Sequence, residues 1–259
     1  MANTKNSGEL DAMREAGRVA GAVREEVACW IRPGLTTREI DEFAADCIAR
    51  HDAVSAFKGY RGYPCNICIS VNEEVVHGLA GNRAIQFGDL VSIDVGVKVD
   101  GWIGDTAMTI PVGGCDLEAQ KLIDVTEQAL YDGISRARSG NRVADISRAI
   151  QNRVEANGFS IVREFVGHGV GRTVHEEPQI PNFVGGGASP RLKAGMTVAI
   201  EPMVNVGLPG VKTLGDGWTV VARDGRPSAH FEHTIIIHDG EPEIVTCPAK
   251  MPSGSAVSS

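Results

Sequence analysis

The sequence lacks long apolar runs, and this limits the classes of protein that it can encode. Its apolar stretches have the length of strands, well below the roughly 20 residues that a helix needs to cross a bilayer. The first ten residues, MANTKNSGEL, are polar and contain no apolar signal segment. We therefore expect a globular protein of the cytoplasm with no membrane partner.

Basic residues and cysteines are also scarce. The chain has 25 Lys and Arg against 33 Asp and Glu, and the net charge of -8 argues against a nucleic-acid partner. Six cysteines at irregular spacing favour reduced thiols over a disulfide framework. Cys65 and Cys68 form a C-x-x-C pair, but a zinc site would need a second such pair or paired histidines nearby. Buried or pocket-lining thiols are the favoured interpretation, and a separate role for Cys65 is left open.

Helical and extended segments follow one another in an order that repeats. The 42% of hydrophobic residues can supply the core of one large α/β domain. Periodicity and stop signals predict helices over 9–30, 36–50, 116–138 and 143–157, the second opened by a capping box from Thr36 to Glu39. Strands are predicted around 53–57, 65–71, 90–99 and 102–110, and residues 248–259 are predicted to form a flexible tail.

An internal duplication underlies this order. The stretches PGLTTREI and SGNRVADI each join two helices, and GDLVSID at 88–94 matches GMTVAIE at 195–201. GDTAMTI at 104–110 resembles FEHTIII at 231–237, so Asp94 falls on Glu201 and Asp105 falls on Glu232. The second match has an offset about 20 residues longer than the first, which predicts an insertion between the two strands of the second half. Chance likeness between β-rich segments is the alternative, but it does not explain why an acid recurs at both matched positions.

A hairpin places the first two acids together. Asp100-Gly101 is a strong two-residue turn signal, and it pairs Gly96 with Asp105. Asp94 and Asp105 then become diagonal neighbours on one face, with backbones roughly 7–8 Å apart. Gly96 is expected to leave open space beside Asp105 for a ligand.

Four buried carboxylates would repel one another strongly, and divalent cations are the usual remedy. In EFVGHGVGRTVHEEP, glycines surround His168, and His175 follows seven residues later. One imidazole with four carboxylates suits a pair of borderline or hard ions such as Mn, Fe, Co or Zn. Glu176 and Glu177 are expected to be turn-start or helix-start acids with solvent partners.

Taken together, these residues resemble the motifs of a known protein family. The stretches VSIDVG, GWIGDTAMTI, EFVGHGVGRTVHEEP, VAIEPMVN and HFEHTIII resemble the methionine aminopeptidases of the bacterial type I class, from about residue 9 to 246. The resemblance implies an α/β pita-bread fold, in which two pseudo-symmetric halves, about 9–112 and 113–247, form a curved antiparallel sheet covered by helices. The absence of a long insertion after His175 or after Glu201 resembles type I and not type II.

The resemblance also implies a ligand set and a cofactor. Two divalent ions, drawn from Co, Mn, Fe, Ni or Zn, would be held by Asp94 on one ion, by Asp105 and Glu232 as bridges, and by His168 and Glu201 on the other ion. Such a site lowers the pKa of a water molecule held between the ions and polarises the scissile carbonyl. Glu201 would pass the water proton to the leaving amine.

Substrate contacts follow from the same resemblance. His175 would hydrogen-bond the substrate carbonyl or the oxyanion, and His77 would contact the substrate amide. The methionine pocket would use His77, His175, Tyr60, Tyr63, Cys68 and Trp218. Val174 stands where relatives often carry Phe or Met, and Phe57 stands where some carry Cys or Thr, so the detailed pocket shape is left open.

The favoured function is removal of the initiator methionine from nascent chains whose second residue is small, by a monomeric enzyme; contact with the ribosome is left open. One alternative is a related hydrolase of Xaa-Pro peptides, which usually carries a further N-terminal domain. Another is a pita-bread binding protein without activity, which loss of a ligand would mark. All five implied ligands are present.

Overall fold

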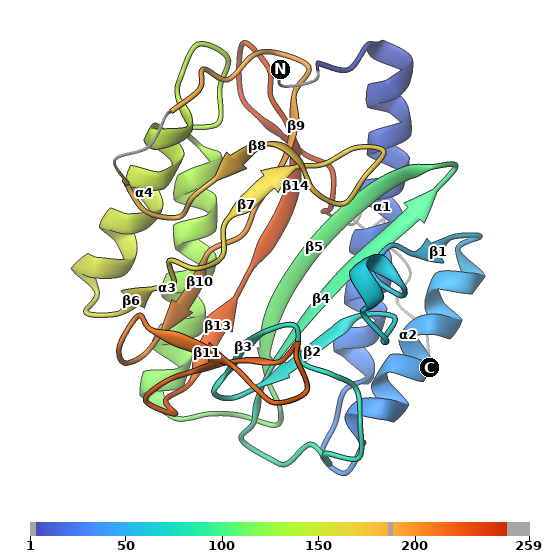
Figure 1. Cartoon of the computed structure of the whole chain (residues 1–259), viewed down its shortest axis with the longest axis vertical. Helices are drawn as coiled ribbons and strands as arrows, with labels where there is room; N and C mark the ends of the chain where they lie inside the picture. The colour runs from blue at the N-terminus through green and yellow to red at the C-terminus, as the bar shows by residue number, and fades with distance from the viewer. Residues whose placement is uncertain (1–3, 186–188, 248–259) are drawn as a thin grey trace, which may run out of the picture.

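The computed structural model describes residues 4–185 and 189–247 (Figure 1). The flexible tail predicted for 248–259 lies outside the described residues. Among the helices in these ranges, none is long and apolar enough to span a membrane.

The helices begin where the sequence supplies capping groups. Asn6 accepts a hydrogen bond from the Glu9 amide in a capping box, and Thr36 and Glu39 form the predicted capping box of the second helix. Asp116 caps the third helix as a side-chain acceptor, so it stands just outside that helix. The helices are α1 (Ser7–Trp30), α2 (Thr37–Arg50), α3 (Leu117–Ile134) and α4 (Val143–Ala156), with a 3-10 turn η1 (Tyr60–Gly62).

Strands occupy most of the remaining chain. Two of them, β4 and β5, are ten residues long and form the hairpin predicted around Asp100-Gly101. The strands are β1 (Val54–Ser55), β2 (Cys68–Val71), β3 (Glu74–Val76), β4 (Leu90–Val99), β5 (Trp102–Pro111), β6 (Ser160–Ile161), β7 (Gly167–Gly169), β8 (Glu176–Ile180), β9 (Thr197–Ile200), β10 (Met203–Asn205), β11 (Val211–Thr213), β12 (Val220–Ala222), β13 (Ser228–His230), β14 (Glu232–Ile236) and β15 (Glu243–Ile244).

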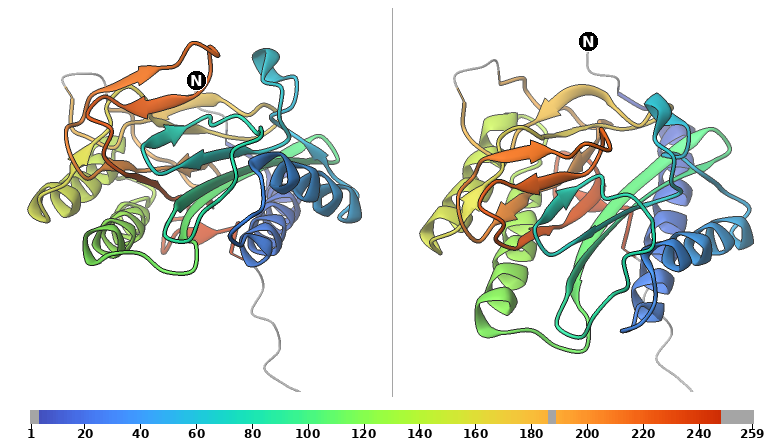
Figure 2. Two further views of the ribbon diagram at one scale, coloured as in Figure 1. Left: turned by 90° about the horizontal axis from the view of Figure 1, so that it is seen from below. Right: turned by 60° about the horizontal axis from the view of Figure 1, so that its bottom comes forward.

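One large antiparallel sheet runs through the molecule. Within the described ranges it has nine strands in the order β1-β4-β5-β14-β9-β7-β8, with β2 paired to β4 and β15 paired to β14. Seen from below, the helices α1 to α4 lie on one side of this curved sheet, and the small strands β3, β11 and β12 lie on the other (Figure 2). The face of the sheet away from these four helices is therefore bordered by the small strands.

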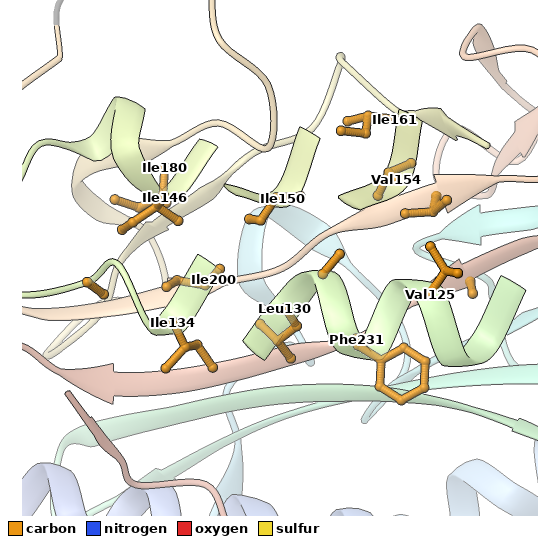
Figure 3. Close-up of a cluster of buried hydrophobic side chains, with 14 of the residues drawn as sticks. Val125, Leu130, Ile134, Ile146, Ile150, Val154, Ile161, Ile180, Ile200 and Phe231 are labelled. Atoms are coloured by element: carbon orange, nitrogen blue, oxygen red, sulfur yellow. The ribbon is translucent and has the colours of Figure 1, made fainter. Parts of the chain in front are cut away.

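Each helix pair has its own apolar cluster against the sheet. Helices α3 and α4 bury side chains such as Leu130, Ile146 and Ile150 against Ile200 and Phe231 (Figure 3). Helices α1 and α2 bury Val23 and Ile40 against β2 and β4. Burial of apolar surface on this scale holds both helix pairs to the same face of the sheet.

Two details of the elements differ from the sequence-based prediction. Helix α3 ends at Ile134, four residues before the predicted end, because the chain turns at Ser135 and continues through turns to Ser139. The strand predicted around 53–57 is reduced to the two residues of β1. The insertion predicted in the second half corresponds to β10–β13, which build small sheets with β6 and β3.

Candidate metal centre and substrate cavity

The strand register brings three acids to one place on the sheet. Asp94 on β4 is opposite Ala107 on β5, and Glu232 on β14 is opposite the same Ala107 from the other side. Asp105 lies two residues before Ala107, so its side chain points to the same face. The pairing of Gly96 with Asp105 is the register predicted from the turn.

That face is the one away from the helices. Gly104 packs on α1 so closely that an added Cβ would lie 2.3 Å from the carbonyl oxygen of Ala16. Ile93 and Val95 belong to the apolar cluster under α1 and α2. Because side chains alternate along a strand, Asp94 and Asp105 face the opposite side.

His168 joins the acids from β7. Its Nδ1 lies 2.9 Å from the carbonyl oxygen of Gly169, to which an Nδ1–H donates, so the Nε2 lone pair is left free. Nε2 lies 3.4 Å from Glu201 Oε1 and 3.9 Å from Asp105 Oδ2. Glu201 follows directly after β9, and Asn182 Nδ2 donates to its backbone carbonyl at 3.0 Å. The Gly169 contact orients the His168 ring with Nε2 toward the acids, and the Asn182 contact holds the backbone of Glu201.

The acidic cluster has the character of a cation site. One ligand atom from each of Asp105, His168 and Glu232 lies within 4.8 Å of the other two. The Oδ1 atoms of Asp94 and Asp105 are buried and have no hydrogen-bond partner among the described residues. A buried carboxylate oxygen without a donor costs several kcal/mol unless it is neutralised or binds a cation, so divalent cations fit this donor set.

The pKa values of the cluster point the same way. Burial raises the pKa of Asp94 to about 7. Burial, and then the charge of neighbouring acids, raises the pKa values of Asp105, Glu201 and Glu232 well above their ordinary range. Burial, with His175 nearby, lowers the pKa of His168 to about 4, which keeps the imidazole neutral as a ligand must be.

A cavity of about 220 Å³ opens over these acids. All eleven residues that the sequence singled out for the site line it, and they come from both of the predicted halves. The lining is Phe57, Tyr60, Arg61, Tyr63, Cys68, His77, Asp94, Asp105, Phe165, Val166, His168, Val174, His175, Glu201, Trp218 and Glu232.

Two histidines project into the cavity with restricted orientations. His175 lies 3.0 Å through Nδ1 from the Tyr60 hydroxyl, and its ring is 4.3 Å from that of His168 between centroids. His77 has a left-handed backbone with φ of 59°, a conformation found where tertiary structure imposes it, often at functional sites. The rings of Phe165 and Trp218 lie nearly perpendicular to its ring. Burial lowers the pKa of His77 to about 4 and lowers that of His175 as well.

Two sequence-based expectations are wrong. The space beside Gly96 is not open, because an added Cβ would lie 2.3 Å from Cε1 of Phe57, whose ring fills it and borders the cavity. Glu176 does not start a turn or a helix with solvent partners. It lies in β8 and pairs with the buried Nζ of Lys5 at 3.1 Å, while its other oxygen accepts from the Arg172 and Thr173 amides.

The structure also adds residues that the sequence reasoning did not select. Arg61, Phe165 and Val166 line the cavity, and His230 is buried with Nε2 3.8 Å from Glu201 Oε2. His230 stands two residues before Glu232, and this spacing in an extended segment was a signal that could have found it. No comparable signal marks Phe165 and Val166, which precede a short strand in a loop.

Comparison with known proteins agrees with this geometry. The model of metallopeptidase family M24 matches residues 11–239. Methionine aminopeptidase of Clostridium perfringens is 51% identical over 242 residues, covering 93% of this chain and 97% of that protein. The crystal structure of methionine aminopeptidase from Thermotoga maritima has a TM-score of 0.93 at 43% identity, covering 95% of this chain and 100% of that one.

The chain therefore belongs to metallopeptidase family M24, with the pita-bread fold of that family. Within the family, the two relatives named above, at 51% and 43% identity, are bacterial methionine aminopeptidases. Prolidase from Pyrococcus furiosus, with a TM-score of 0.76 and 20% identity over 66% of its chain, shares the fold alone.

Proposed function

We propose that this protein is a cytoplasmic methionine aminopeptidase that removes the N-terminal methionine from nascent chains and peptides with a small second residue. The observation that carries the proposal is the cluster of four carboxylates and His168 at the base of one apolar-walled cavity. Asp105 and Glu232 are buried, and Asp94 and Glu201 are partly buried. The cavity is of a size suited to a single side chain, and its walls include Tyr63, Cys68 and Trp218.

The cluster would hold two divalent cations. Four carboxylates carry four negative charges when ionised, and two doubly charged ions balance them. Asp94 would serve one ion, Asp105 and Glu232 would bridge, and His168 and Glu201 would serve the other. Bound there, the ions would supply Lewis acidity toward a water molecule and toward the scissile carbonyl. Mixed oxygen and nitrogen ligands suit Mn, Fe, Co, Ni or Zn.

The residues of the chain would then handle the protons and the substrate. Glu201, whose pKa is raised by burial, can accept a proton from the attacking water and return it to the leaving amine. If Nδ1 of His175 accepts from Tyr60, its Nε2–H is free to donate to the substrate carbonyl oxygen. His77, held between Phe165 and Trp218, would contact the amide that joins methionine to the second residue.

Three tripeptides test the activity. Protein stripped of metal and reloaded with Co(II) or Mn(II) should release free Met from Met-Ala-Ser, with little release from Met-Lys-Ser or from Ala-Pro-Ser. Cleavage of Ala-Pro-Ser with Met-Ala-Ser left intact would favour an Xaa-Pro hydrolase. Failure to cleave any of the three, with metal bound, would favour a binding protein without activity.

The ligand set has its own test. Asp105→Asn keeps the shape of the side chain and removes a bridging charge, so turnover of Met-Ala-Ser should be abolished. Asp100→Asn, in the exposed turn of the same hairpin, is the matched control and should leave turnover unchanged. Near-normal turnover by Asp105→Asn would refute the assignment.

A further inference from the structure

Glu201 is flanked by two buried imidazoles, and only one of them has a role so far. Its Oε1 lies 3.4 Å from His168 Nε2, and its Oε2 lies 3.8 Å from His230 Nε2. The side chain of His230 is 3% exposed, and among the described residues its Nε2 has no hydrogen-bond partner. A buried ring nitrogen left without a partner is costly unless it serves another group nearby.

The backbone of His230 is fixed on two sides. On β13 it pairs with Met203 of β10, the strand that begins two residues after Glu201. The Thr109 hydroxyl of β5 accepts from the His230 amide at 2.8 Å and donates to the His230 carbonyl at 3.0 Å. The backbone that carries the imidazole is therefore held by the strand that carries Asp105 and by the strand next to Glu201, as that of a residue that orients a ligand should be.

We propose that His230 is a positioning residue for Glu201, whose outer oxygen Oε2 accepts a hydrogen bond from the neutral His230 Nε2–H. The role rests on the proposed function of Glu201 as ligand and proton carrier. The present 3.8 Å separation exceeds a hydrogen bond by roughly 1 Å, and such contacts commonly tighten only in the loaded enzyme.

As a consequence, the two oxygens of Glu201 would have different roles. Oε1, which faces His168, is kept for the cation that the two residues would share, and Oε2 is held away from it. A carboxylate fixed in this way would present one oxygen to a bound cation in a constant direction. Partners of this kind around a metal ligand typically contribute 10-fold to 100-fold to metal affinity or activity.

The test compares two substitutions at one position. His230→Gln places an amide N–H near the position of Nε2, whereas His230→Leu fills similar volume and donates nothing. Each chelator-stripped protein is titrated with Co(II) by calorimetry, and turnover of Met-Ala-Ser is then measured for the loaded protein. The His230→Leu variant should bind Co(II) more weakly, and its kcat should fall by roughly tenfold or more while KM changes less than about twofold. Gln should restore both to within about threefold of the natural protein.

His233→Leu is the matched control. His233 is also buried, three residues further on, but it contacts Thr246 and Tyr131 and does not line the site cavity. It should lower the melting temperature without weakening Co(II) binding. The proposal is overturned if His230→Leu binds Co(II) like the natural protein, if Gln is as impaired as Leu, or if His233→Leu weakens Co(II) binding equally. Because Co(II) affinity is read without substrate, these results are separate from whether Met-Ala-Ser is the right substrate.

Discussion

At the scale of single residues, the acids of this site lower the stability of the fold unless a neighbouring group offsets the cost of burying them. Asp94 is flanked in β4 by Ile93 and Val95, which are fully buried under the helices. The burial that makes those neighbours stabilising also removes water from the carboxylate and raises its pKa. A cation offsets this cost and restores the ionised form.

Asp94 therefore predicts a pH dependence for the metal-free protein. Its folded-state pKa of about 7 lies above the ordinary value of 3.8, so the folded state binds the proton more tightly. This contribution to stability is complete at low pH and is lost as pH rises through about 7. In the presence of a chelator, the free energy of unfolding of the natural protein should fall as pH rises from low values through about 7. The fall should be smaller for Asp94→Asn. Urea unfolding at several pH values measures it, and identical pH profiles would contradict the prediction.

At the scale of elements, the close packing of α1 on β5 determines which face of β5 is turned toward the helices. Gly104 leaves no room for a side chain against the Ala16 carbonyl, and Gly17 in α1 is equally close to Val245. The alternation along β5 then turns Asp105 to the other face and places Thr106 under α1, where Arg24 donates to its hydroxyl at 2.7 Å. The packing of a helix thus determines which face of the strand carries the chemistry.

Gly104→Ala tests this packing. The added methyl group must push α1 away from the sheet, which should cost about 1–3 kcal/mol of the free energy of unfolding and weaken Co(II) binding at the neighbouring Asp105. Gly81→Ala is the control, because nothing lies within 4 Å of its added Cβ. Urea unfolding and calorimetry of both variants measure the effect, and equal stability of the two would refute it.

The loop that carries His175 is stabilised by a segment distant in sequence. Lys5, whose side chain is 3% exposed, donates from Nζ to the Val170 carbonyl and pairs with Glu176. Glu176 in turn accepts from amides of that loop. Lys5→Met should leave the Glu176 carboxylate without its cation in a partly buried position, and should lower kcat for Met-Ala-Ser several-fold with Co(II) binding unchanged. Lys58→Met, on the surface, serves as the control. Unchanged kcat in Lys5→Met would show that the loop keeps its position without the Lys5 ion pair.

At the scale of the whole molecule, the proposed ligands come from both predicted halves. Asp94 and Asp105 lie on the hairpin of 9–112, and His168, Glu201 and Glu232 lie within 113–247. The sheet is continuous between them through the pairing of β5 with β14. In this pairing Glu232 lies opposite Ala107 and His233 lies opposite Thr106. Cations at this junction would bind both halves, and the two-half division itself stays a prediction.

Removal of metal should therefore lower global stability. A ligand that binds only the folded state stabilises it by about 2.7 kcal/mol at 100 times its dissociation constant. Saturating Co(II) should raise the melting temperature of chelator-stripped protein by several degrees, and Asp105→Asn should show a much smaller rise. Scanning calorimetry with and without Co(II) measures this, and an equal rise in both proteins would place the stabilising ion elsewhere.

The sequence by itself determined the features that depend on local patterns. The Thr36 capping box, the Asp100-Gly101 turn, the β4–β5 register and the matched acids of the two halves follow from spacing, because caps and turns are short-range and side chains alternate along strands. Tertiary structure alone decided what fills the remaining space. Phe57 occupies the gap beside Gly96, Lys5 reaches Glu176 from 171 residues away, and His230 approaches Glu201 from the neighbouring strand β13. These contacts join residues far apart in the chain, and only the packing of helices on the sheet fixes their separations.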